Sequence, residues 1–270
     1  MKLIQKMIII QYLKIKKKII NKFTMVSFRN FRNNAILSNI KIIKFISQVN
    51  PDPFAASVIF HAPMDGFVTD RTGNVNVTPN GDLTYDAGPF VGTNGYVYDT
   101  RSSNKYLTYD PFPIDGDFTL EYWGMITDSV TSGQQLLYGN YGLENGIAFQ
   151  HTSGSTIRFA FINASSTGVT TVGSISFLRN EWHFITITRE DDLWKFYLNG
   201  NLVSQTTSNR ILDTAHGMRI GIADITSASY DPGSSTGFLG TGRIFDLRIT
   251  EAIRYTDDFT PPDSPFPRIN

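Results

Sequence analysis

The acidic side chains offer no evident pair for glycoside hydrolysis. A retaining glycosidase uses two carboxyl groups about 5 Å apart, one as the nucleophile and one as the acid/base. Glu121 has no acidic partner at the positions of its predicted strand where one would fall, which hold Tyr122, Trp123 and Met125. The acids at 190–192 fall between two predicted strands, where adjacent acids are usually solvated turn residues. We therefore predict that the protein is not an enzyme; a glycoside hydrolase that uses Glu121 is the less favoured alternative.

The sequence also gives no sign of a metal site or disulfide built from histidine or cysteine. The histidines lack the i, i+4 or short-gap spacing of a zinc site, so we expect them to be ordinary strand or turn residues. They are His61, His151, His183 and His216. Cysteine is absent, which excludes disulfides and thiolate metal sites.

Calcium is the one metal that the pattern of oxygen ligands allows. Asp70 and Asn74 flank the predicted turn at Gly73, and Asp65 is close in sequence. Calcium takes six to eight hard oxygen ligands, and these three residues are the candidate metal ligands. The alternative, which we favour, is that Asp70 and Asn74 only form the turn by bonding to their own backbone. We expect no other cofactor.

Two predicted loops combine the residue types that bind sugars. Glycan binding needs an exposed aromatic ring for stacking beside amide or carboxylate groups that form hydrogen bonds. The loops at 139–146 and 229–233 both offer that combination. The predicted ligand-binding residues are Asn140, Tyr141, Glu144, Tyr230 and Asp231.

Tryptophans within predicted strands are the alternative stacking residues. Trp123 and Trp194 both lie in such strands, where tryptophan usually fills the core. The strand at 117–126 alternates with a period of two. One face carries Phe118, Leu120 and Tyr122, and the other carries Thr119, Glu121 and Trp123.

The chain beyond residue 57 has the pattern of an all-β sandwich. Short runs rich in Val, Ile, Thr, Tyr and Phe alternate with Gly, Asn, Asp and Pro. Asn199-Gly200 predicts a two-residue hairpin turn. So many strands require two packed sheets or a closed barrel. The predicted strands are 58–61, 96–98, 106–109, 117–126, 134–138, 147–151, 156–162, 182–188, 193–198, 202–206, 218–222 and 240–249.

The zero net charge is a cancellation between two regions. Eleven of the 24 Lys and Arg residues precede residue 50 and the first acid is Asp52, so the first 50 residues carry +11 and the rest −11. We predict a basic N-terminal tail or anchoring segment at 1–53 and one domain at 54–270. The basic segment suits an acidic or apolar partner surface, and the acidic domain should not bind nucleic acid.

The basic segment leaves two alternatives open. Residues 1–24 read as a poorly ordered tail or as an extension upstream of a second start at Met25. Residues 25–49 carry Ile36, Ile40 and Ile43 at helical spacing and could dock onto a partner. Lysines interrupt every apolar run, so we predict no membrane span.

Several groups of residues in the body of the chain occur in the order of a known family. They are 60–66, 70–74, 117–123, 182–200 and 243–262. Together they resemble the laminin G-like, concanavalin A-like jelly roll, in the variant found in bacteriophage virion proteins. Thr72 replaces the usual serine of the loop at 70–74. Phe184 replaces a frequent histidine, which weakens the case for a site there.

The resemblance implies a concanavalin A-like two-sheet jelly-roll sandwich that binds rather than catalyses. It also implies that the Arg254-Tyr255 and 259–262 elements fold back over the sandwich. We expect a virion structural or adhesion protein that contacts host-surface glycans or neighbouring virion proteins. A free, extracellular carbohydrate-binding lectin is the alternative, and homo-oligomerisation stays open because the segment at 25–49 lacks clean heptads.

Overall fold

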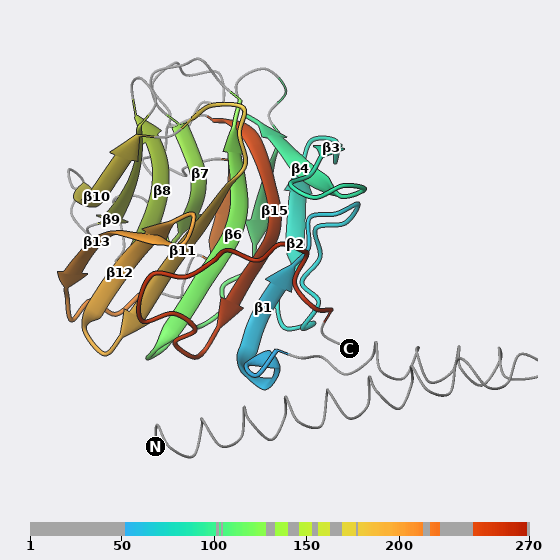
Figure 1. Ribbon diagram of the computed structural model, residues 1–270. Helices are drawn as coiled ribbons and strands as arrows, with labels where there is room; N and C mark the ends of the chain where they lie inside the picture. The colour runs from blue at the N-terminus through green and yellow to red at the C-terminus, as the bar shows by residue number, and fades with distance from the viewer. Residues whose placement is uncertain are drawn as a thin grey trace, which may run out of the picture. The chain divides into compact units, whose positions relative to one another are not determined.

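Two antiparallel sheets pack face to face to form a sandwich (Figure 1). The computed structural model describes residues 52–100, 103, 105–127, 133–139, 146–152, 156–162, 169–176, 178–212, 217–221 and 240–268. A 3-10 turn, η1 (Ala55–Ser57), precedes the first strand. The strands are β1 (Val58–Ala62), β2 (Val77–Asn80), β3 (Tyr85–Ala87), β4 (Asn94–Asp99), β5 (Tyr106–Tyr109), β6 (Phe118–Ile126), β7 (Gly133–Tyr138), β8 (Gly146–Thr152), β9 (Thr156–Ile162), β10 (Val169–Ser176), β11 (His183–Glu190), β12 (Leu193–Leu198), β13 (Asn201–Thr207), β14 (Met218–Ile220) and β15 (Thr241–Thr250).

Within the described residues, the first sheet has eight strands in the order β13-β12-β11-β6-β15-β4-β3, with β1 paired to β15. The second sheet has seven strands in the order β10-β9-β8-β7-β14-β5-β2. We call them the eight-stranded sheet and the seven-stranded sheet. This arrangement confirms the predicted all-β two-sheet sandwich and is consistent with a concanavalin A-like jelly roll.

All twelve predicted strands are present, and the described residues contain three further strands that share one property. Strands β2, β3 and β10 each lie at an edge of a sheet. Edge strands tolerate residues that interior strands avoid. Strand β2 contains Pro79, β3 has three residues, and β10 has an irregular register before Gly173. Their sequences therefore carry weak β patterns.

The turn between β12 and β13 has the predicted geometry. Asn199 and Gly200 have φ angles of 51° and 79°, and Leu198 pairs with Asn201 directly across the turn. Two consecutive positive φ angles are the requirement of a tight hairpin, which Asn-Gly meets at low steric cost. The hairpin prediction is confirmed.

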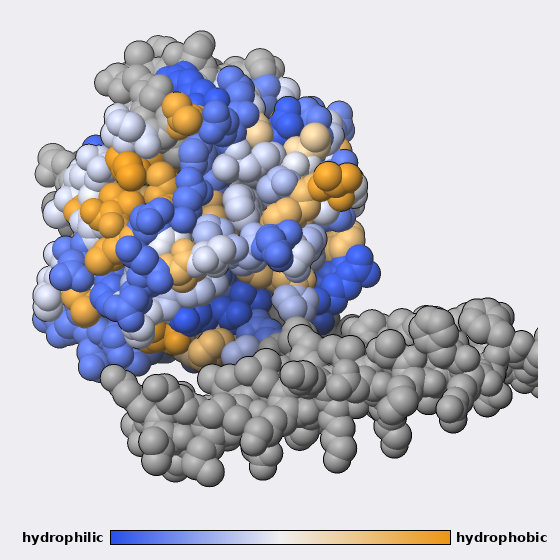
Figure 2. All heavy atoms as spheres, in the orientation of Figure 1, coloured by the Kyte–Doolittle hydropathy of each residue, from blue (hydrophilic) through white to orange (hydrophobic). Residues whose placement is uncertain are grey.

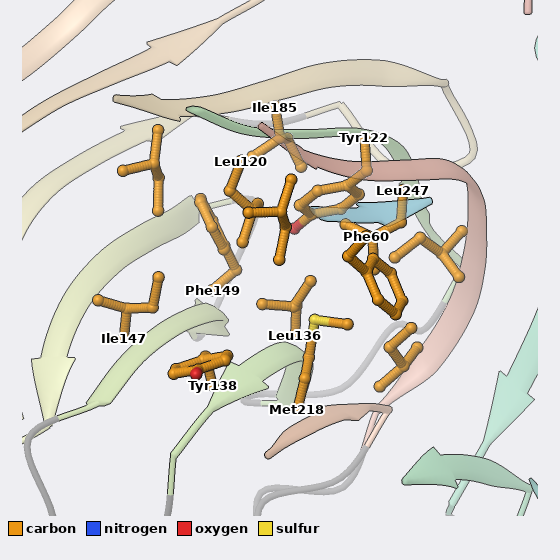
Figure 3. Packing of buried hydrophobic residues seen from close by; sticks show 14 of the residues in the cluster. Phe60, Leu120, Tyr122, Leu136, Tyr138, Ile147, Phe149, Ile185, Met218 and Leu247 are labelled. Atoms are coloured by element: carbon orange, nitrogen blue, oxygen red, sulfur yellow. The ribbon is translucent and has the colours of Figure 1, made fainter. Parts of the chain in front are cut away.

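The core lies between the sheets and is rich in aromatic residues. Figure 3 shows Tyr122 of β6 and Phe149 of β8 pointing toward one another across the sandwich, and their ring centroids are 5.7 Å apart. Trp194 is fully buried, with edge-to-face contacts to Phe118 and Phe161. The expectation that Trp194 fills the core is therefore confirmed.

The outer face of the eight-stranded sheet is also covered, over part of its area, by the end of the chain. Residues 252–268, which we call the C-terminal strap, fold back across β6, β11 and β12 (Figure 1). Thr119 Oγ1 donates to the Ala252 carbonyl at 2.8 Å and accepts from the Arg254 amide at 3.0 Å. The Phe259 amide donates to the Gly200 carbonyl at 2.9 Å. The strap thus runs where the resemblance implied.

The strap explains why the predicted alternation of β6 does not give a solvated face. Thr119 and Glu121 point away from the core residues Phe118, Leu120 and Tyr122, yet both have 0% exposure. Polar residues on an outer sheet face normally meet water. Here a segment more than 130 residues further along the chain meets them instead.

Candidate functional site

Glu121 is the centre of a buried ionic network on the outer face of β6. Its Oε1 accepts hydrogen bonds from Arg248 Nε at 2.9 Å and Arg248 Nη2 at 2.7 Å. Its Oε2 accepts from the Tyr255 hydroxyl at 2.8 Å. Arg254 Nε lies 3.0 Å from Oε1 as a second ion pair. Strand β15 supplies Arg248, and the strap supplies Arg254 and Tyr255.

Asp52 completes this network from the start of the described chain. Its Oδ2 accepts from Arg248 Nη1 at 2.7 Å and from Arg254 Nη2 at 2.8 Å. Asp52 therefore belongs with the sandwich, two residues before the predicted domain start at 54. Two carboxylates alternate with two guanidinium groups, and no side chain of the four is more than 10% exposed. We call Asp52, Glu121, Arg248, Arg254 and Tyr255 the ionic network.

The network shifts the pKa of three of its members. Burial and the neighbouring Glu121 raise the pKa of Tyr255, so its hydroxyl keeps the proton that it donates. Burial favours a lower pKa for Arg254, but Glu121 and Asp52 outweigh burial and raise the pKa. Burial favours a higher pKa for Asp52, but hydrogen bonds from Arg254 and the Phe54 amide, with the charges of Arg254 and Arg248, lower the pKa overall.

The lowered pKa of Asp52 predicts a pH dependence of stability. A carboxyl group whose folded-state pKa lies below its ordinary value of 3.8 stabilises the fold above that value, and the contribution disappears as pH falls through the lowered pKa. Asp52→Asn should therefore be less stable than the wild type at pH 7, and the difference should shrink below pH 3.8. Urea unfolding at several pH values measures this. The exposed Asp192→Asn is the control; a difference that stays constant with pH contradicts the assignment.

Asp70 organises the loop that follows β1. Its Oδ1 accepts from the amides of His61 and Thr72 at 2.9 and 3.1 Å. Its Oδ2 accepts from the Thr72 hydroxyl at 2.5 Å and from the amides of Asn74 and Val75, both at 3.1 Å. Five protein donors therefore meet this carboxylate, as in an Asx turn.

The other candidate calcium ligands have partners of their own. Asp65 Oδ1 accepts from the Asn94 amide at 2.8 Å and from Asn94 Nδ2 at 3.2 Å. Asn74 Nδ2 donates to the Ile59 carbonyl at 3.3 Å. Among the residues that the structure describes, no three His, Cys, Asp or Glu side chains gather as a metal site would require. The contacts of Asp70 with the amides of Thr72 and Asn74 fit the turn-forming alternative, and calcium binding stays a prediction.

The predicted sugar-binding residues lie outside the described residues. They are Asn140, Tyr141, Glu144, Tyr230 and Asp231. The residues that flank the two loops are described. The Gly139 amide donates to the Gly217 carbonyl at 2.8 Å, and the Gly221 amide donates to the Gln135 carbonyl at 3.0 Å. The first contact is at the end of β7 and the second near its start, about 13 Å apart at 3.3 Å per residue.

The two described histidine side chains have structural partners. His61 Nε2 lies 2.7 Å from Asp246 Oδ1 in a pair that is almost completely buried. Asp246 Oδ2 accepts from the amide of Phe266 in the strap. His183 Nδ1 lies 3.0 Å from Asn199 Nδ2, and its Nε2 lies 3.1 Å from the Leu178 carbonyl oxygen. Burial lowers the pKa of this imidazole. Neither histidine is placed as a metal ligand.

A shallow depression lies beyond β13, where the sequence indicated nothing. It has a volume of about 330 Å³ and is lined by Ser208, Asn209, Arg210 and Ile211. The Arg210 guanidinium lies 4.9 Å from the centre of the Phe161 ring and donates to the Ile162 carbonyl. Arg210 thus joins the rim of the depression to β9.

Trp123 does not lie in the core. It is half-buried on the outer face of the eight-stranded sheet, beside the region that the strap covers. Its ring contacts Phe90 and Phe184 at centroid distances of 5.4 and 5.1 Å. Figure 2, drawn in the orientation of Figure 1, shows hydrophobic groups interspersed with hydrophilic residues over the surface on this side of the molecule.

The described part of the chain contains no helix long and apolar enough to cross a membrane. The search of curated proteins finds no match.

Solved structures share the fold at low sequence identity. The binding domain of botulinum neurotoxin serotype D has a TM-score of 0.57 at 13% identity, covering 75% of this chain and 49% of that chain. The botulinum neurotoxin DC binding domain in complex with rat synaptotagmin II has a TM-score of 0.57 at 14% identity, covering 76% and 50%. The chain thus spans about half the length of these neurotoxin domains.

A shorter neighbour matches over most of its own length. Domain 4 of AbnA, a GH43 extracellular arabinanase from Geobacillus stearothermophilus, was solved with arabinotriose and has a TM-score of 0.55 at 15% identity. The match covers 73% of this chain and 93% of that domain. The family model of the concanavalin A-like lectin/glucanases superfamily matches residues 93–252, more than half of the sequence. The chain therefore belongs to the concanavalin A-like lectin/glucanases superfamily.

Proposed function

We propose that this protein is a non-catalytic binding module whose sandwich contacts glycans or proteins. The observation that carries the proposal is the state of Glu121. A catalytic carboxylate must reach its substrate. The carboxylate of Glu121 is fully buried and is held by Arg248, Arg254 and Tyr255. A neighbour on the same fold was solved with arabinotriose, which supports glycan as one ligand class.

The hydrolase alternative has a direct test. The full-length protein is incubated with plant and bacterial polysaccharides and the reducing ends are counted. We expect no release above a buffer control. Release that Glu121→Gln abolishes, in a variant that is still folded by circular dichroism, would contradict the proposal.

The finer proposal is a virion structural or adhesion protein. The basic segment at 1–50 attaches the chain to a particle, and the acidic sandwich contacts host-surface glycans or neighbouring virion proteins. The charge difference between the two regions and the strap with its Arg254-Tyr255 element support it. The test is incorporation into particles by the full chain and by a chain that lacks residues 1–50. Equal incorporation contradicts the anchoring role, and a free lectin is then the better description.

The two predicted sugar-binding loops give a second expected outcome. A glycan array probed with the full chain should yield hits, and the affinity for a hit should fall about tenfold when the stacking tyrosine is lost. The variants that test the two loops are Tyr141→Ala and Tyr230→Ala. Titration calorimetry measures the affinities. An array without hits favours protein contacts alone.

A further inference from the structure

A second tryptophan lies on the outer face of the eight-stranded sheet beside Trp123. Trp182 directly precedes β11, and the chain between β10 and β11 runs across this side of the sheet (Figure 1). Trp182 is two positions before Phe184, and Phe184 pairs with Trp123 of β6. Both tryptophans are half-buried, whereas Phe184, which contacts Trp123, is fully buried.

Gly95 of β4 makes room for the Trp182 indole. Gly95 alternates with the core residues Tyr96 and Tyr98, so its open Cβ position faces the outer side of the sheet. A Cβ at this position would lie 2.6 Å from Trp182 Cη2 and 3.0 Å from its Cζ2. The indole therefore lies against bare backbone, and a larger residue at 95 would displace it.

The ring of Trp123 is fixed by aromatic neighbours. Phe90 meets it edge to face at a centroid distance of 5.4 Å and also meets Phe245 at 5.8 Å. The next residue, Val91, is fully exposed. We call Phe90, Trp123 and Trp182 the aromatic platform. All three residues are half-buried, and the platform lies close to the strap, because Phe184 contacts both Trp123 and Phe259, the latter at a centroid distance of 6.1 Å.

Polar groups stand beside the platform. Arg243 of β15 precedes Ile244, whose carbonyl oxygen lies 3.3 Å from the same Cβ position of Gly95. The Arg243 guanidinium pairs with Asp86, and their side chains are 22% and 55% exposed. The pair supplies donors and acceptors for hydroxyl groups while its charges cancel, which favours an uncharged ligand over an acidic one.

We propose that the aromatic platform is a binding site for a neutral oligosaccharide, with sugar rings stacked on Trp182 and Trp123 and hydroxyl groups bonded to the Arg243–Asp86 pair. The site rests on the proposed function of glycan binding and adds to it a surface that the loop tyrosines do not include. Rigid aromatic rings with a few polar groups at their edge are the usual composition of a saccharide or small-ligand site.

The experiment titrates the full-length protein with arabinotriose, xylotriose and maltotriose, and with sialyllactose as the acidic comparison. Intrinsic fluorescence follows binding, because Trp182 and Trp123 are two of the three tryptophans. We expect a neutral sugar to shift the emission and protect it from acrylamide quenching. Trp182→Ala and Gly95→Val should each weaken binding about tenfold or more. Trp194→Phe alters the buried tryptophan and should leave the affinity unchanged.

The outcomes distinguish a failure of the aromatic platform from a failure of the proposed glycan-binding function. Glycan binding that survives Trp182→Ala and Gly95→Val but is lost in Tyr141→Ala or Tyr230→Ala overturns the platform and leaves the proposed function standing. Binding of sialyllactose in preference to the neutral sugars overturns the ligand class. If neither these sugars nor an array binds, the glycan function and the platform both fail. Circular dichroism confirms that each variant is folded, and Gly95→Ala is the milder second variant.

Discussion

Replacing Glu121 with alanine is expected to lower the free energy of unfolding by about 3–5 kcal/mol, the usual effect of removing one partner from a buried ion pair. The variant leaves Arg248 and Arg254 buried beside a single carboxylate, that of Asp52, and removes the acceptor of the Tyr255 hydroxyl. For a domain of this size the melting temperature should fall by roughly 10 °C, at about 2–4 °C per kcal/mol. Thermal and urea unfolding of the full chain measure the change.

Two further variants separate charge from surface effects. Glu121→Gln keeps the shape and part of the hydrogen bonding, so its stability should lie between those of the alanine variant and the wild type. Glu190→Ala removes an exposed acid at the end of β11 and should change the free energy of unfolding by less than about 0.5 kcal/mol. An alanine variant at 121 as stable as Glu190→Ala would contradict the structural role of the network.

Removing the C-terminal strap should have the second large effect. A chain ending at Ala252 lacks Arg254, Tyr255, Phe259 and Phe266, so it exposes Phe184 and opens one side of the Glu121–Arg248 pair. Losing one buried aromatic alone costs about 3–5 kcal/mol. Small domains are stable by only about 5–15 kcal/mol. We therefore expect the truncated chain either to lose its cooperative unfolding transition or to unfold at a much lower urea concentration than the wild type.

The measurement for the strap is urea unfolding followed by tryptophan emission, with binding of a hydrophobic dye as a second readout. Phe266→Ala, which removes one buried ring while keeping the ionic network, should give an intermediate loss. Thr260→Ala, at an exposed strap position, is the matched control. A truncated chain with the wild-type midpoint would show that the strap does not stabilise the sandwich.

Most of the fold could be predicted because the interior strands show a local alternation of apolar and polar residues. Phe118, Leu120 and Tyr122 alternate with polar residues, and the alternation alone indicates which side faces the core. The Asn199-Gly200 turn likewise depends on two adjacent residues. The strands that escaped prediction are at sheet edges, where packing constrains the sequence less.

The burial of Glu121 could not be predicted, because its cause is not local. The partners Arg248 and Tyr255 are 127 and 134 positions away in the chain, and no spacing rule relates them to β6. The same holds for the contact of Trp182 with Gly95. The turn at Asp70 is the opposite case, since its donors at 72, 74 and 75 follow within five residues. The loop residues Tyr141 and Tyr230 stay predictions.

Asp52 gives the sandwich a defined mechanical connection. A force that pulls on the chain before residue 52 acts first on Asp52. The carboxylate of Asp52 is bonded to Arg248 of β15 and to Arg254. Load is thereby shared between a central strand and the closing segment before β1 begins to peel from β15. Because water reaches these charges poorly, resistance to pulling from this end should depend less on ionic strength than it would if an exposed surface pair held the chain.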